Sequence, residues 1–479
     1  MALTPFDHHK IIVRIVIAIV LVAEIVHSWG FFDKTSAPAT EIRKLAIAEL
    51  EVKLARRILE LEARIFVGGL FFVQELDAKS TEGSAFEARI RPMVAQALHE
   101  LSGQQEGNAL VWFLRYQIAI GLVFDFDTQA AQWLTVLFEQ PFDDASGQSV
   151  DRALERVVYR QPLGVEDAAL LSRELGTAGK ALVMQLGKAG DAGGELRRQI
   201  LTEFHHLAFI VMLFVAALLL GLFFTLFYGF VLVFGLARRH FACAAFESES
   251  LLWTWGAYLG VMFAAGTLLP HLSAIESIDS ALRINLGVIL GTLVLVTLPV
   301  LAGASWPAVR EAIGLEIHNA GSLFKDICIG PTFYLASLFP LFVFLMLFSL
   351  LLTQFNIELT SATHPIVFTF INPDQEGVRA FIVVLAVVIA PCVEEIMFRG
   401  VLYAWFRCRF GAVLSVAITS LIFALVHPQG IIGVPVLFLI GSMLGILREW
   451  RGNLVAPILY HACLNGGTML LLTTMLRAQ

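Results

Sequence analysis

The order of apolar and polar residues divides the chain into a short apolar opening, a long polar stretch and a mostly apolar second half. A helix needs about 20 mainly apolar residues to cross the hydrocarbon core of a bilayer. Apolar runs near that length predict about nine membrane-spanning helices. They cover residues 11–32, 206–237, 251–272, 284–303, 331–353, 380–404, 411–428, 431–447 and 454–475. The pattern therefore predicts an all-α polytopic membrane helix bundle.

The first apolar run has two interpretations. Ala37-Pro38-Ala39 resembles the cleavage site of a signal peptide. That sequence lies well past the end of the run, however, so we expect residues 1–32 to remain as an N-terminal transmembrane anchor.

The polar stretch 33–205 is long enough to be a domain with its own core. Residues 41–65 place apolar side chains at the three-to-four spacing of an amphipathic helix. The run 110–124 is apolar but contains Arg115 and Gln117, so we expect a buried core helix there and not a span. Further helical character recurs at residues 88–101, 150–159, 166–175 and 178–187. We predict an inserted, soluble, mainly helical domain without catalytic spacing.

The distribution of Lys and Arg predicts the orientation of the bundle, because these residues gather in cytoplasmic loops. One set of connections between the predicted spans is basic, whereas the loop 354–378 contains no Lys or Arg. The basic residues are Arg238, Arg239, Arg310, Lys325, Arg407, Arg409, Arg448 and Arg451. With nine spans, the N-terminus is cytoplasmic and 33–205 is extracytoplasmic. We expect a multi-pass protein of the cell membrane, in a bacterium the inner membrane.

Composition supports the membrane assignment and narrows the partners. Hydrophobic residues make up 57% of the chain and charged residues 15%, against about 45–50% and about 25% in soluble domains. The net charge is −7 and no basic block occurs, which argues against nucleic acid. We expect the lipid bilayer to be the main partner, with residues 33–205 as a candidate surface for an extracytoplasmic protein.

Candidate chemistry is concentrated in the last four predicted spans. Ionisable side chains inside a membrane are expensive and mark functional sites. The ionisable residues in these spans are Glu394, Glu395, Arg399, His427 and His461, and the amide of Asn465 lies one turn after His461. We therefore divide the apolar half into transmembrane helices with a cytoplasmic loop, residues 206–330, and a candidate catalytic core, residues 331–479.

Spacing predicts that these groups form one site. Glu394 and His427 lie almost equally far from the polar turn at 409–411, on the two arms of a helical hairpin. Because each residue of a helix rises about 1.5 Å, both should lie at the same depth. His461 and Asn465 are one turn apart and share a helix face.

Less specific interpretations exist for the same residues. A buried histidine is commonly a hydrogen-bonded core residue, and Glu395 with Arg399 can form an ion pair within one helix. A proton-coupled transporter would also use Glu and His at mid-membrane, but it would have an inverted repeat. Residues 206–353 contain no second copy of the Glu/His pattern.

Three short motifs carry a family resemblance. They are Glu394-Glu395-Ile-Met-Phe-Arg399-Gly400, Phe423-Ala-Leu-Val-His427 and His461-Ala-Cys-Leu-Asn465. In this order on near-successive apolar helices they resemble the Glu-Glu-x-x-x-Arg, Phe-x-x-x-His and His-x-x-x-Asn motifs of the CPBP family of intramembrane proteases. This family includes CAAX prenyl endopeptidases and Abi-type bacteriocin-processing and immunity proteins. The resemblance is clear over 380–475 and looser over 330–479.

The resemblance implies an intramembrane endopeptidase that hydrolyses peptide bonds of membrane-associated substrates. Glu394 would act as the general base on a water molecule that His427 also holds. His461 and Asn465 would form the oxyanion hole, while Arg399 would neutralise Glu395 and Phe423 would pack beside them. The alternative from the same family is a non-catalytic membrane scaffold or an immunity protein.

The resemblance leaves two schemes for metal use. In the first, no cofactor is present and the glutamate alone activates the water. In the second, a zinc ion is bound by Glu394, His427 and His461. The sequence has no His-Glu-x-x-His signature, which favours the metal-free scheme.

Overall fold

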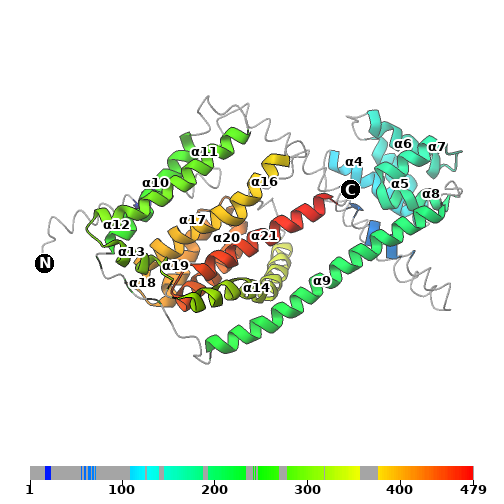
Figure 1. Ribbon diagram of the computed structural model, residues 1–479. Coiled ribbons are helices and arrows are strands. Elements are labelled where there is room, and N and C mark those ends of the chain that lie inside the picture. Colours follow the sequence, from blue (N-terminus) through cyan, green and yellow to red (C-terminus); the bar gives the residue numbers. More distant parts are fainter. Residues whose placement is uncertain are drawn as a thin grey trace. The chain divides into compact units, whose positions relative to one another are not determined.

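The computed structural model describes part of the chain. The described residues are 14, 17–22, ten residues between 56 and 71, 108–124, 127–139, 145–186, 193–233, 241, 243, 246, 248–268, 278–317, 319–355 and 376–477. All regular elements in these ranges are helices, which confirms the all-α prediction (Figure 1). The expected helix 88–101 lies outside the described residues, as do most of 11–32 and 41–65.

The chain divides into two compact units, residues 41–215 and residues 1–40 with 216–479. The first unit contains five described helices before the long helix α9. They are α4 (Asn108–Val123), α5 (Asp127–Phe138), α6 (Ala145–Val158), α7 (Val165–Glu174) and α8 (Gly176–Gln185).

Helix α4 is the centre of the core of the first unit. Its side chains from Val111 onward are almost all buried, as expected for the run 110–124. Arg115 is tolerated there because buried Asp151 of α6 accepts from its Nε at 2.7 Å and from a second guanidinium nitrogen at 3.0 Å. The apolar run is therefore a buried core helix that contains a neutralised charge.

The second unit carries the apolar half of the chain. Its larger part begins within α9 (Gly193–Val233) and continues, among the described residues, through eleven further α-helices, with 3-10 and π-helical turns between some of them. These α-helices are α10 (Glu249–Leu268), α11 (Ile278–Gly291), α12 (Leu298–Leu301), α13 (Trp306–Ile313), α14 (Ala320–Gln354), α16 (Glu376–Val384), α17 (Ala390–Glu395), α18 (Tyr403–Arg407), α19 (Ala412–Leu425), α20 (Gly430–Arg451) and α21 (Val455–Arg477). A 3-10 turn, η3 (Thr292–Thr297), joins α11 to α12.

Among the described residues, six helices are long and apolar enough to cross a membrane. They are Gly193–Val231, Glu249–Leu268, Arg283–Leu301, Ala320–Leu352, Gly377–Arg407 and Ile432–Arg451. Together with the shorter apolar helices α19 and α21, they coincide with all eight spans predicted after residue 205. This confirms the polytopic bundle.

Helix α19 differs from the span predicted at 411–428. It has 14 residues, about 21 Å at about 1.5 Å per residue, which is shorter than the roughly 30 Å of a hydrocarbon core. Helix α19 ends at Leu425, and His427 follows it in the turn before α20. Because the helix ends early, the backbone of His427 is not helical.

The helix Gly377–Arg407 contains two π-helical turns. They are η4 (Leu385–Ile389) and η5 (Ile396–Leu402), and the six residues of α17 lie between them. Such turns are rare and occur frequently at functional sites. The two carboxylates of the candidate site, Glu394 and Glu395, are the last two residues of α17.

Candidate active site

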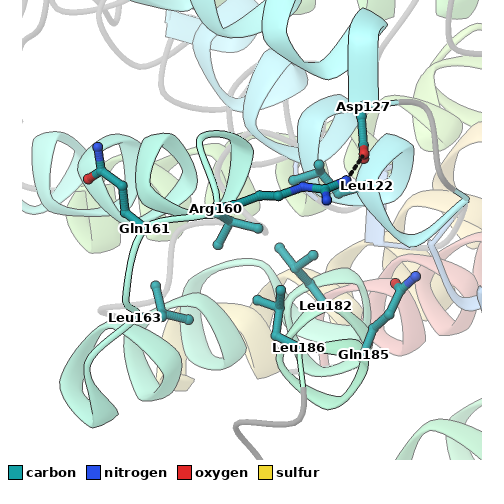
Figure 2. Close-up of a pocket in the computed structure, with 9 residues that line it drawn as sticks. Leu122, Asp127, Arg160, Gln161, Leu163, Leu182, Gln185 and Leu186 are labelled. Atoms are coloured by element: carbon teal, nitrogen blue, oxygen red, sulfur yellow. Dashed lines mark hydrogen bonds and ion pairs between the residues drawn. The ribbon is translucent and has the colours of Figure 1, made fainter.

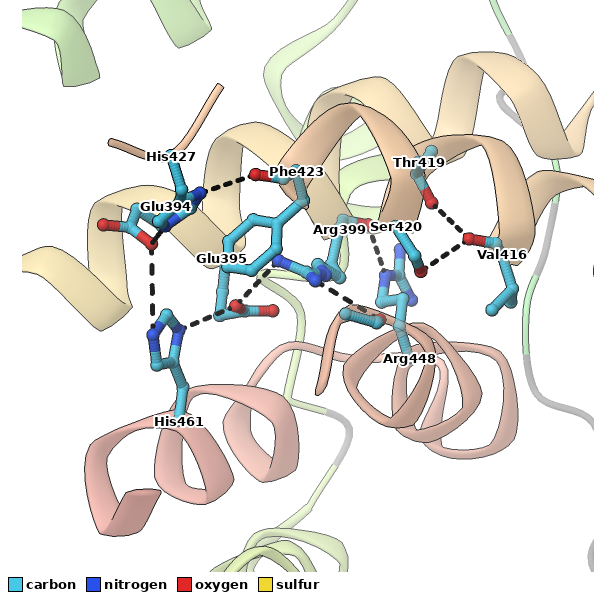
Figure 3. A network of polar contacts seen from close by, with 11 residues as sticks. Glu394, Glu395, Arg399, Val416, Thr419, Ser420, Phe423, His427, Arg448 and His461 are labelled. Carbon is cyan, nitrogen blue, oxygen red and sulfur yellow. Dashed lines mark hydrogen bonds and ion pairs between the residues drawn. The ribbon is translucent and has the colours of Figure 1, made fainter. Parts of the chain in front are cut away.

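The segments α17 and η5, the end of α19 with the turn after it, and α21 bring together Glu394, Glu395, Arg399, Phe423, His427 and His461 (Figure 3). The Glu394 carboxylate lies between two imidazoles. Its Oε2 is 3.8 Å from His427 Nε2 and 3.9 Å from His461 Nε2. The side chains of Glu394 and His427 therefore lie beside each other, as their spacing from the turn at 409–411 predicted.

The side chain of Glu394 is more exposed to solvent than that of Glu395. Its side chain retains 25% of its exposure, although Oε2 itself is buried and has no hydrogen-bond partner. A buried carboxylate oxygen without a partner costs about 1–3 kcal/mol or more. That cost is removed if a water molecule or a substrate group donates to Oε2.

The partners of the two Nδ1 atoms determine which ring nitrogen is free. His427 Nδ1 is 2.5 Å from the main-chain oxygen of Phe423, which can only accept, so Nδ1 carries the proton. His461 Nδ1 is 3.0 Å from Glu395 Oε1 and donates to that carboxylate. In the neutral form of each ring, Nε2 therefore presents its lone pair toward Glu394.

Glu395 forms the buried second layer of the site. It is fully buried, and Arg399 donates to its Oε1 at 3.1 Å one turn later in the same helix. Arg399 is 1% exposed and also donates to the main-chain oxygen of Gly441 in α20 at 3.3 Å. The carboxylate of Glu395 is thus shared by Arg399 and His461, and the predicted pairing with Arg399 is present.

Phe423 packs in the interior, as predicted. Its ring lies 4.3 Å from the Arg399 guanidinium and 4.2 Å from the His427 ring centre. Its main-chain oxygen holds His427 Nδ1. The ring of Phe423 therefore packs against both the Arg399 guanidinium and the His427 imidazole.

Asn465 makes a contact that the sequence did not predict. Its Nδ2 donates to the main-chain oxygen of Ala386 in the π turn η4 at 2.8 Å. One of the two amide hydrogens is thereby used to hold α21 against this turn, and the other remains for the oxyanion role that the family resemblance implies.

Arg448 is a further buried residue that sequence reasoning placed among the loop charges. It is 1% exposed and donates to the main-chain oxygen of Arg399 at 3.0 Å. An arginine just after an apolar run gives the same sequence signal whether it lies in a loop or inside the bundle, so nothing in the pattern distinguishes the two.

The described residues, as they are placed, do not fit the alternative zinc site of Glu394, His427 and His461. Zinc ligands lie about 2.0–2.2 Å from the metal in a tetrahedral arrangement. No group of three or more His, Cys, Asp or Glu side chains in the described part of the chain is placed to hold a metal ion, Glu394 with its two histidines included.

A cavity lies in the unit 41–215 (Figure 2). It is a cavity of about 380 Å³ with an apolar lining that includes Leu122, Leu163 and Leu182. Arg160 reaches over it and pairs with Asp127 at 3.0 Å. The lining contains no histidine, cysteine or second carboxylate, so the cavity lacks the groups for acid–base or nucleophilic catalysis.

Comparisons with known proteins agree with the site in α17–α21. Residues 376–467 match the family described as Type II CAAX prenyl endopeptidase Rce1-like, which confirms the resemblance of this segment to the CPBP proteases. An uncharacterized 24.3 kDa protein of Escherichia coli is 36% identical over 78 residues, which are 15% of this chain. The chain spans 36% of the length of that relative. No solved structure matches the chain.

Proposed function

We propose that this multi-pass membrane protein is an intramembrane endopeptidase that cleaves membrane-associated peptides with a water molecule activated by Glu394. The family match over residues 376–467 supports a CAAX-type protease at the level of the family. The observation that carries the proposal is the convergence of His427 Nε2 and His461 Nε2 on Glu394 Oε2, an unpartnered buried atom.

The arrangement suits hydrolysis because neutral His427 carries its proton on Nδ1 and leaves Nε2 free to accept a hydrogen bond. A water molecule between Glu394 Oε2 and His427 Nε2 would donate one hydrogen to each, and its lone pair would be free to attack a peptide carbonyl carbon. The attack forms a C–O bond and transfers a water proton to Glu394. Protonated Glu394 then gives this proton to the departing peptide nitrogen as the C–N bond breaks, so the carboxylate is regenerated.

His461 acts as an oxyanion donor in its protonated form. Its Nδ1 hydrogen is held by Glu395, so only a second proton makes Nε2 a donor. Glu395 and Arg399 hold the ring of His461 in this orientation. The charged Nε2–H and the remaining amide hydrogen of Asn465 would together stabilise the tetrahedral oxyanion.

We propose the metal-free scheme for this chemistry, with zinc as the alternative. We further propose that the protein lies in a bacterial inner membrane with its N-terminus in the cytoplasm. Residues 33–205 would then lie on the extracytoplasmic side, where they offer a surface for a protein partner. The buried core of α4–α8 and its cavity support a domain that folds as a unit.

Comparative proteomics of membranes tests the function. Cells that express the wild-type protein or Glu394→Ala are compared for new peptide termini in membrane-associated proteins. We expect termini that depend on Glu394. Identical sets of termini would instead support the non-catalytic scaffold or immunity protein. A synthetic peptide ending in an S-farnesylated CAAX sequence, with its unlipidated counterpart, then tests whether the substrate carries a lipid.

A further inference from the structure

The two π turns on either side of Glu394 and Glu395 are each held by a side chain from another helix. A widened turn shifts the helical hydrogen-bond register and leaves main-chain groups that need other partners. In η4, the oxygen of Ala386 accepts from Asn465 at 2.8 Å. In η5, the oxygen of Arg399 accepts from Arg448 Nε at 3.0 Å. The short segment α17 is thus fixed at both ends.

The guanidinium of Arg448 donates to two further main-chain oxygens besides that of Arg399. Its guanidinium also donates to the main-chain oxygen of Ala312 in α13 at 2.9 Å and to that of Gly452 just after α20. Three carbonyls from three elements therefore meet one planar group, which is almost fully buried. Lysine cannot reproduce this, because a single ammonium lacks the fixed fork of donors.

We propose that Arg448 is a positioning residue for the candidate active site, and this inference rests on the proposed function. It holds the main chain at Arg399, whose side chain donates to Glu395 Oε1 at 3.1 Å. Glu395 Oε1 holds His461 Nδ1 at 3.0 Å, and this ring directs Nε2 to Glu394. A displaced Arg448 therefore shifts the imidazole that faces the catalytic carboxylate.

Gly314 provides a way to displace the guanidinium without removing it. This residue follows α13 with φ +79°, and a Cβ there would lie 2.7 Å from Arg448 Cζ. Gly303 has φ +98° and would place its Cβ in open space. Gly314→Ala and Gly303→Ala both incur the strain of a left-handed alanine. Only the first also presses on Arg448.

The experiment measures kcat and KM for purified protein in lipid vesicles. The probe is a synthetic peptide that spans the strongest cleavage site lost in Glu394→Ala membranes. Arg448→Lys and Gly314→Ala should each lower kcat by about 10²-fold with KM nearly unchanged, because small misplacements of reacting groups cost about that much. The matched controls are Gly303→Ala and Arg407→Lys. Arg407 pairs with Glu449, beside Arg448 in α20.

Two results would overturn the positioning role. The first is a kcat per folded molecule for Arg448→Lys and Gly314→Ala that equals the controls. The second is a loss of activity explained entirely by a lower folded fraction, measured from the thermal midpoint of each variant. Equal cleavage by the wild type and Glu394→Gln is a separate outcome, which would overturn the proposed function and the positioning role with it.

Discussion

Removing the Arg399 side chain should destabilise the bundle through the carboxylate that it leaves behind. Arg399→Met keeps most of the side-chain volume but deletes the donors to Glu395 and to the oxygen of Gly441. Both members of the ion pair are almost fully buried. Breaking a buried pair by removing one partner costs about 3–5 kcal/mol, largely because the remaining charge is uncompensated.

Adding Glu395→Gln to Arg399→Met should recover part of the lost free energy of unfolding. In Arg399→Met with Glu395→Gln, the charge is absent and the amide oxygen can still accept from His461 Nδ1. We therefore expect the double variant to lose about 2 kcal/mol less than the sum of the two single variants, within the usual range of coupling for residues in contact.

Unfolding in mixed micelles of dodecylmaltoside and increasing dodecyl sulfate, followed by tryptophan fluorescence, measures the four corners of this cycle. The exposed i,i+3 pair of Arg198 with Glu195, at 3.0 Å, is a matched control. Arg198→Met should leave the midpoint unchanged, since solvated pairs contribute little. Additive losses, or a cost of less than about 1 kcal/mol for Arg399→Met, would refute the account of a neutralised buried carboxylate.

Three further outcomes follow from the site and the charge pattern. His461→Ala should reduce turnover by about 10²–10³-fold, as loss of an oxyanion donor does, with the metal content of the purified protein unchanged; loss of bound zinc in this variant would favour the metal scheme. Activity should persist in chelator, whereas activity lost to chelator and restored by zinc would contradict the glutamate scheme. Single cysteines at Ser84 and Ser361 should both react with a membrane-impermeant reagent from outside the cell, and reaction at one alone would mean a miscounted span.

The sequence was sufficient for the parts of the structure that depend on apolar length. A span must be long and continuous in apolar residues, so the eight runs after residue 205 all correspond to helices. The interruption of 110–124 by Arg115 correctly indicated a core helix, because an unpaired charge would not be tolerated in lipid. The hairpin spacing of Glu394 and His427 likewise predicted that their side chains lie beside each other.

Features that depend on tertiary contacts were outside the reach of the sequence. The π turn η4 has a local signal in Pro391, which lacks the N–H of a regular helix. The contacts of Asn465 with η4 and of Arg448 with η5 come from distant helices and have no such signal. The protonated nitrogen of each histidine depends on which acceptor lies beside Nδ1. The early end of α19 did have a local signal that the predicted span 411–428 overran, because Pro428 disfavours helical geometry in the residue before it.

The most direct test of the account is the behaviour of purified Glu394→Gln. The amide has almost the shape of the carboxylate but cannot take a proton from water. The same synthetic peptide is incubated with each protein in ¹⁸O-labelled water, and the new carboxyl terminus is analysed by mass spectrometry. The account predicts one solvent oxygen in the product of the wild type and no product from Glu394→Gln at an unchanged unfolding midpoint. Cleavage by Glu394→Gln at the wild-type rate would contradict the role of Glu394 as general base.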